Sequence, residues 1–210
     1  MKRIHLVAVV VALAALLSAS VARADFMTFL GKGRTSVVRI HAPGLVSDGR
    51  RVYAGEYRVR FRDVDYPAYC VDIDAWAGSS EVTIQGPGTL LNGQQVAYLF
   101  ETYAPQVSSG VEAAGLGVAI WEVLYETPGN AFDPLHGYFR ISDNPAVASV
   151  ALAMLANLPD SYSPHPYTAV LVSPCKQDML IFGGPGIPEP AALSLIALGA
   201  VGVVVRRRRR

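Results

Sequence analysis

The chain has few of the side chains on which enzymes rely. Three of its four histidines lie beyond residue 24, at positions 41, 136 and 165, well separated from one another. There is no His-Glu-x-x-His zinc motif, no Gly-x-Ser-x-Gly nucleophile turn and no phosphate-binding glycine loop. A serine or cysteine nucleophile therefore has no recognisable base in the sequence. We expect a protein that is not an enzyme and that uses no metal or other cofactor.

Charged residues are also scarce, at 17% of 210 residues, against 51% hydrophobic residues. Eight of the 18 basic residues lie in the first 24 residues or the last five. The segment between these ends therefore carries ten basic residues against all 17 acidic ones, a net charge near −7. Such a charge excludes a basic nucleic-acid-binding protein, and the hydrophobic content excludes a disordered chain.

No apolar run is as long as the roughly 20 residues of a typical transmembrane helix, but a shorter run lies near the N-terminus. Two basic residues precede the apolar stretch Leu6–Leu17, and small residues follow it up to Ala22 and Ala24. A positive start, a short apolar core and an Ala-x-Ala site are typical of a secretory signal peptide. We expect signal peptidase to remove residues 1–24 and the remainder to be exported.

The C-terminus consists of a Gly/Pro linker at 183–187 and a three-part tail at 188–210. The middle part of the tail, 191–205, is apolar or small throughout. As a helix it would be about 22 Å long, short of the roughly 30 Å core of a bilayer. The motif before it and the tail after it consist of Pro188, Glu189 and Pro190, and of Arg206, Arg207, Arg208, Arg209 and Arg210.

This C-terminal arrangement resembles the PEP-CTERM sorting signal of Gram-negative bacteria over 188–210. The resemblance implies that the chain is a substrate of exosortase, a membrane-embedded cysteine transpeptidase that cleaves near the Pro-Glu-Pro element. It also implies residence in the inner membrane before processing and a final place at the cell surface or in the extracellular matrix. Exopolysaccharide or surface proteins are the partners expected there. A plain tail anchor is the alternative, and the short apolar part argues against it.

Residues 25–182 have the patterns of one α+β domain, rich in strands and barrel- or sandwich-like, with about three inserted helices. The two-residue period of a strand is clearest at 57–62, where Tyr57, Val59 and Phe61 alternate with arginines. Further strands are predicted at 36–41, 69–73, 81–85, 137–141, 168–173 and 178–182.

Helices are predicted at 94–103, 111–125 and 145–158. The second is apolar nearly all round, which predicts burial. Capping residues precede all three helices. The pairs Ser109 with Glu112 and Asn92 with Gln95 predict capping boxes, and Asn144 is the predicted N-cap before Pro145.

Cysteine occurs only twice, as Cys70 and Cys175. In an exported protein, two cysteines most simply form a disulfide. Closing the loop between them would stabilise the fold by up to about 4–5 kcal/mol in the chain-entropy model. Two buried free thiols are the alternative.

A second resemblance concerns most of 61–158. The aromatic-Cys-x-acid segment around Cys70 and the helix segment 113–123, with its Ala-Ile-Trp, resemble the thioester domains of surface adhesins. The resemblance implies an internal thioester between Cys70 and a glutamine at position 117, which would acylate a neighbouring amine. Position 117 is a glycine, so we expect an adhesion or matrix module that has lost this chemistry. A covalent adhesin is the alternative and would need another glutamine, namely Gln94, Gln95 or Gln106.

Acidic and aromatic groups leave further alternatives open. Salt bridges with nearby arginines explain two Asp-x-Asp pairs more simply than a Ca²⁺ site does; the pairs are Asp63, Asp65, Asp72 and Asp74. Aromatic side chains could instead form a sugar-stacking platform, which would make the domain a carbohydrate-binding matrix module. The candidates are Trp76, Tyr66, Tyr69, Tyr125, Tyr138 and Trp121, the last of which we expect in the core.

Overall fold

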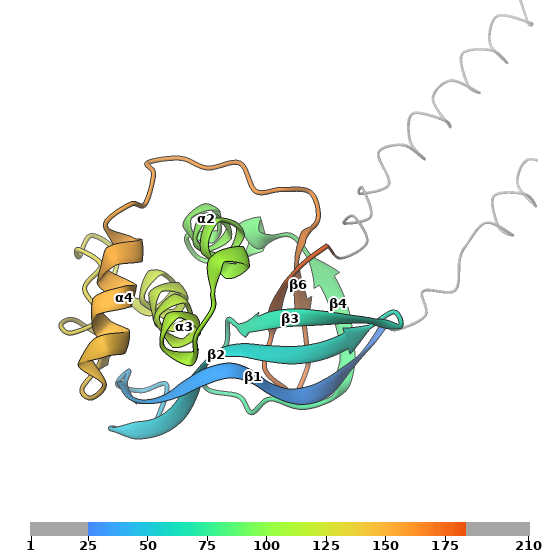
Figure 1. Ribbon diagram of the computed structural model, residues 1–210, viewed down its shortest axis with the longest axis horizontal. Helices are drawn as coiled ribbons and strands as arrows, with labels where there is room; N and C mark the ends of the chain where they lie inside the picture. Colours follow the sequence, from blue (N-terminus) through green and yellow to red (C-terminus); the bar gives the residue numbers. More distant parts are fainter. Residues whose placement is uncertain (1–24, 184–210) are drawn as a thin grey trace, which may run out of the picture.

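The computed structural model describes residues 25–183, which form one α+β domain (Figure 1). Within these residues lie seven strands, three α-helices and two short 3-10 turns. The strands are β1 (Asp25–His41), β2 (Arg50–Phe61), β3 (Val64–Cys70), β4 (Ser80–Gln85), β5 (Arg140–Ile141), β6 (Thr168–Val172) and β7 (Met179–Phe182). The helices are α2 (Gly93–Tyr103), α3 (Gly110–Tyr125) and α4 (Pro145–Leu155), and the turns are η1 (Pro87–Thr89) and η2 (Ala104–Gln106).

The strands form one antiparallel sheet in the order β2-β3-β7-β6-β4-β1-β5, and β1 also pairs with β2. This extra pairing closes six strands into a ring. Strand β1 makes the closure possible because it pairs along β2 on one edge while its two ends pair with β4 and β5 on the other. Closure leaves few unpaired strand edges and corresponds to the barrel-like form of the predicted architecture.

Helix α3 lies between the sheet and the other helices (Figure 1). Its residues 113–124 are all buried, as its apolar sequence predicts. Two glycines let it approach its neighbours closely. Gly115 faces Val150 of α4, and a Cβ at Gly117 would lie 2.9 Å from the backbone nitrogen of Gly55 in β2.

The predicted helix caps are confirmed at two of three helices. Ser109 and Glu112 form the capping box of α3, and the Asn144 side chain accepts from the Val147 N–H at the start of α4. The capping box predicted at Asn92 is wrong. Asn92 adopts a left-handed backbone (φ 51°) without a side-chain cap, and its side chain donates to the Val123 carbonyl at 2.8 Å. It therefore ties α2 to α3.

Several predicted elements have different ends in the structure. The strand predicted at 69–73 ends at Cys70, and the one at 137–141 is reduced to β5. Alternation in β2 is confirmed, since Tyr57, Val59 and Phe61 are buried. Arg62 lies beyond the strand in a tight turn, with a positive φ of 48°.

Within residues 25–183, no helix is long and apolar enough to cross a bilayer. The predicted signal peptide and the apolar part of the tail lie outside the described residues.

Candidate functional site

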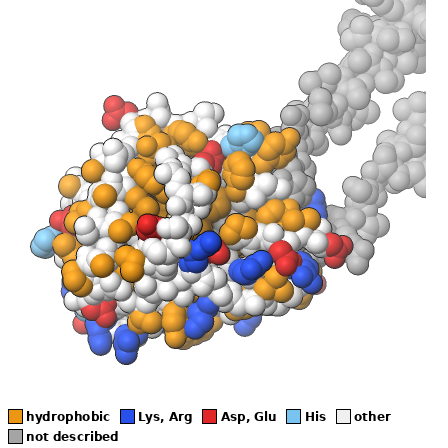
Figure 2. All heavy atoms as spheres, in the orientation of Figure 1, with side chains coloured by type: hydrophobic (Ala, Val, Ile, Leu, Met, Phe, Trp, Pro, Cys, Tyr) orange, Lys and Arg blue, Asp and Glu red, His pale blue; other side chains and the backbone are white. Residues whose placement is uncertain are grey.

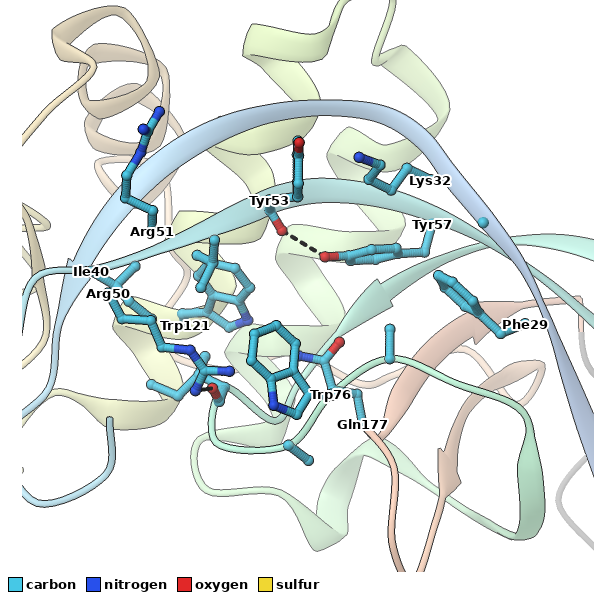
Figure 3. Close-up of a pocket in the computed structure, with 15 residues that line it drawn as sticks. Phe29, Lys32, Ile40, Arg50, Arg51, Tyr53, Tyr57, Trp76, Trp121 and Gln177 are labelled. Atoms are coloured by element: carbon cyan, nitrogen blue, oxygen red, sulfur yellow. Dashed lines mark hydrogen bonds between the residues drawn. The ribbon is translucent and has the colours of Figure 1, made fainter. Parts of the chain in front are cut away.

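A cleft of about 360 Å³ opens between the β1–β2 pair and the loop that follows β3 (Figure 3). Strand β1 contributes Phe29 and Lys32, β2 contributes Arg50 to Tyr53, and the loop contributes Trp76. Gln177, just before β7, and Trp121 of α3 also line it. The cleft therefore draws on five segments of the chain.

Aromatic rings form much of the cleft wall. Trp76 is 71% exposed and Tyr53 is 46% exposed, whereas Trp121 and Tyr57 are buried. The Tyr57 hydroxyl donates to the Tyr53 carbonyl at 2.6 Å, which fixes the inner ring. The Gln177 N–H donates to the Trp76 carbonyl at 3.1 Å and holds the backbone of the Trp76 loop. The cleft thus combines a fixed floor with two rings open to solvent.

Three basic side chains line the same cleft. The Lys32 ammonium lies 3.4 Å from the ring centre of Tyr53, and the Arg50 guanidinium lies 4.3 Å from that of Trp76. Arg51 is exposed beside them. None of the described residues that line the cleft is acidic. These three cations also take part in none of the salt bridges found within 25–183, in contrast to the paired side chains of Arg34, Arg60 and Arg62.

Gln177 was not among the sequence candidates. Its side-chain amide donates to the Asp72 carbonyl at 3.0 Å. Its Oε1 atom is shielded from solvent and has no hydrogen-bond partner among the described residues. Lys32, Arg50, Arg51 and Tyr53 were missed too. The signal for the last three was the Arg-Arg-Val-Tyr segment at 50–53, an exposed aromatic residue beside two basic ones.

The predicted disulfide between Cys70 and Cys175 is not formed. Cys70 is buried at the end of β3, where its thiol donates to the Asp72 carbonyl at 2.8 Å. Cys175 is exposed in the turn between β6 and β7, with its sulfur 3.7 Å from the Ser80 hydroxyl. The two sulfurs therefore face different groups. Burial raises the pKa of the Cys70 thiol well above its usual value, so the thiol stays protonated.

The structure also accounts for the glycine at position 117. Close contact with β2 leaves no room there for a glutamine side chain. Gln94 accepts from the Tyr162 N–H, and Gln106 donates to the Thr102 carbonyl. Gln95 lines a different hollow, beside Phe132. None of these three glutamines, which the sequence offered as thioester partners, is thus placed with its side chain at Cys70.

The aspartate pairs do not gather into a metal site. Within the described part of the chain, no cluster of three or more His, Cys, Asp or Glu side chains could hold an ion. Asp65 pairs with Arg60 at 2.6 Å, as the salt-bridge explanation predicts, whereas Arg62 pairs with Asp25. Burial and the neighbouring Asp74 raise the pKa of Asp72 to about 7.

Of the predicted aromatic platform, the structure brings only Trp76 and Trp121 to the cleft. Trp121 is core, as expected, and its ring N–H donates to the Cys70 carbonyl at 2.9 Å. The other candidate rings lie outside the lining: Tyr66, Tyr69, Tyr125 and Tyr138.

One group has the hydrogen-bond order of a hydrolytic triad. His41 lies 2.5 Å from Asp48 through Nδ1 and 2.8 Å from Ser142 through Nε2. No sequence pattern pointed to this base, because the three residues come from β1, the β1–β2 turn and the segment after β5. The Asp48 side chain is 82% exposed, so water solvates its charge. None of the three residues lines the cleft. The hydrogen bonds of His41 connect the β1–β2 turn to the segment after β5, which is a structural role.

Comparisons with known proteins bear on the tail alone. Residues 186–210 match the family model described as the PEP-CTERM protein-sorting motif. No curated protein and no solved structure matches the chain, so the resemblance of 61–158 to thioester domains finds no support. The predicted sorting residues Pro188 to Pro190, the arginine tail and the cleavage site at Ala22 and Ala24 lie outside the described residues. The chain carries a PEP-CTERM sorting signal and is thereby an exported protein that exosortase processes.

Proposed function

We propose that the domain at 25–183 is a non-catalytic binding module of the cell surface or extracellular matrix, and that the cleft beside Trp76 binds a saccharide. The observation that carries the proposal is the 71% exposure of Trp76 at the rim of a cleft whose floor is fixed. Large aromatic rings are usually at least half buried in a folded domain. A ring left open beside polar groups is typical of a binding site.

The chemistry of the lining suits a sugar ring. The C–H face of a pyranose packs on an aromatic ring, while its hydroxyl groups need hydrogen-bond partners at the ring edge. Trp76 and Tyr53 supply the rings, and Arg50 supplies donors. The unpartnered Gln177 oxygen is an acceptor at the cleft floor. This oxygen is shielded from solvent, so a ligand hydroxyl would reach it only after the Gln177 side chain turned toward the cleft, and the contact would then pair an otherwise unpaired polar atom.

The absence of catalysis is also part of the proposal. The described residues that line the cleft include no carboxylate, histidine or cysteine. The triad-like group at Ser142 is the competing site, so it provides the test. A fluorophosphonate probe should leave the protein unlabelled. Labelling at Ser142 that disappears in His41→Ala would overturn the non-catalytic assignment.

Binding can be measured on protein recovered from the producing cells. The wild-type protein should be retained by a polysaccharide fraction from those cells, and Trp76→Ala should weaken the retention by at least about tenfold. Tyr167→Ala is the matched control, because Tyr167 is 52% exposed and lies outside the cleft. Equal retention of wild type and Trp76→Ala, or no retention by any fraction, would contradict the proposal.

The role of the tail is tested separately. Replacing Pro188, Glu189 and Pro190 with alanine should leave the chain uncut, with its C-terminal arginines still attached. Intact mass spectrometry of the recovered protein reports this directly. A processed product from the substituted chain would show that the sorting enzyme does not use this motif.

A covalent adhesin is the second candidate, because the structure places Gln177 near Cys70. The Cys70 thiol and the Gln177 amide both donate to the Asp72 carbonyl, at 2.8 and 3.0 Å. In a thioester, the Cys70 sulfur would bond to the Gln177 amide carbon, and the amide nitrogen would leave as ammonia with the thiol proton. The raised pKa of Cys70 opposes this step. A mass deficit of about 17 Da, lost in Gln177→Glu, would establish it.

A further inference from the structure

The cleft differs in charge from the domain that contains it. Residues 25–183 contain ten basic and 16 acidic residues, so the domain is acidic overall. The cleft nevertheless collects Lys32, Arg50 and Arg51 without an acidic residue in its described lining. In Figure 2, the basic side chains of the visible face gather over the strands rather than over the helices. A concave site lined by one sign of charge attracts ligands of the opposite sign.

The contacts of these side chains leave their charges available. Lys32 rests on the Tyr53 ring and Arg50 on the Trp76 ring. A cation–π contact orients the cation without cancelling its charge. The only hydrogen bond from the Arg50 guanidinium within 25–183 is a long one, 3.4 Å, to the Ile73 carbonyl. Most of its N–H groups are therefore free to bind a carboxylate, which a guanidinium can contact with two parallel hydrogen bonds.

The exposed aromatic ring and the unpaired basic side chains occur side by side in the cleft, and this combination fits one chemical class of ligand. A sugar ring packed on Trp76 would place its substituents close to the Arg50 guanidinium, which extends toward that ring (Figure 3). Arg51 is a further cation of the lining. We infer that the cleft selects an acidic saccharide, one that carries carboxylate groups on its rings. This inference rests on the proposed function and adds the charge of the ligand to it.

Nucleic acid is a poorer fit to the same cleft. Nucleic-acid-binding proteins typically neutralise many phosphates with a basic surface, whereas this domain has three unpaired cations in one cleft and an excess of acidic residues elsewhere. A single-stranded oligonucleotide is nevertheless included in the test, since it too combines rings with negative charge.

The test compares polygalacturonate with the same polymer after reduction of its carboxyl groups, by titration of the recovered protein. Tryptophan fluorescence is a suitable readout because Trp76 is exposed while Trp121 is buried. We expect polygalacturonate to bind at least about tenfold more tightly than the reduced polymer, and its binding to weaken as salt is added.

Charge variants assign the effect to the cleft. Arg51→Gln and Lys32→Gln should each weaken polygalacturonate binding severalfold and leave binding of the reduced polymer unchanged. Arg58→Gln is the matched control, an exposed arginine of β2 outside the lining. Equal binding of the two polymers would overturn the inference and leave the proposed function standing. Binding of neither polymer would overturn both, and tighter binding of the oligonucleotide would overturn the inference in favour of nucleic acid.

Discussion

Two buried glutamates one turn apart, Glu122 in α3 and Glu126 directly after it, should respond in opposite ways to the same substitution. Glu122 is fully buried and Glu126 is 2% exposed. Glu122 accepts one hydrogen bond, from the Asp133 N–H at 2.8 Å, and its Oε2 atom has no partner among the described residues. Glu126 accepts four, from Thr127, Asn130, Tyr138 and Phe139, and so organises the segment after α3.

These surroundings shift the two pKa values in opposite directions. Burial raises the pKa of Glu122 to about 8, and the negative charges of Glu126 and Asp133 add to the increase. Burial also works to raise the pKa of Glu126, but hydrogen bonds from Asn130 and the backbone outweigh it and lower the pKa. At neutral pH, Glu122 is therefore mostly protonated in the folded state, and Glu126 is ionised.

The signs of the stability effects follow from linkage. In the unfolded chain, Glu122 ionises near the ordinary glutamate pKa of 4.5. The contribution of Glu122 to the free energy of unfolding is therefore fully present below pH 4.5 and is lost as the pH rises toward 8. At pH 7, Glu122→Gln removes this loss and should raise the free energy of unfolding by up to about 3 kcal/mol. Glu126→Gln replaces one acceptor oxygen with a donor and should lower it by about 3–5 kcal/mol. That penalty fades as the pH falls below 4.5, because a protonated Glu126 loses the same bonds.

Urea unfolding followed by tryptophan fluorescence at pH 4, 7 and 8 measures these differences. Glu122→Gln should be close to wild type at pH 4 and more stable at pH 7 and 8. The reasoning is refuted if Glu122→Gln destabilises the protein at pH 7, or if both substitutions change stability in the same direction there.

Three further predictions use simpler assays. Gly117→Gln should destabilise the fold by at least about 1–3 kcal/mol in urea, since its Cβ would lie 2.9 Å from the β2 backbone; Gly88→Gln is the control, because nothing lies within 4 Å of a Cβ there. Thiol titration of the native protein should give one fast equivalent from exposed Cys175 and a second, from Cys70, only after unfolding. If no thiol reacted even after unfolding, the two cysteines would be joined in a disulfide and the prediction would be wrong. Ser109→Ala should lower stability by about 1 kcal/mol through loss of the α3 capping box, and an unchanged urea midpoint would contradict that role.

Local patterns in the sequence were sufficient for part of the fold. The capping box at Ser109 and the apolar sequence of α3 identify a buried helix because both depend on residues within one or two turns of each other. The cap at Asn92 was mispredicted because α3 supplies the partner of its side chain. The disulfide was mispredicted for a similar reason, since counting two cysteines says nothing about which way their sulfurs face.

The linear sequence by itself predicts how this protein is sorted. The sorting motif at 186–210 is identified from the order of its prolines, apolar residues and arginines, without any knowledge of the tertiary structure. The place where a ligand could bind follows instead from the folded chain. Lys32, Arg50, Trp76 and Gln177 are separated by up to 145 positions. The pairing of β1 with β2 brings Lys32 and Arg50 to the cleft, and the pairing of β3 with β7 brings Trp76 and Gln177 there. The difference arises because a sorting motif is an order of residue types along the chain, whereas a cleft depends on long-range strand pairing.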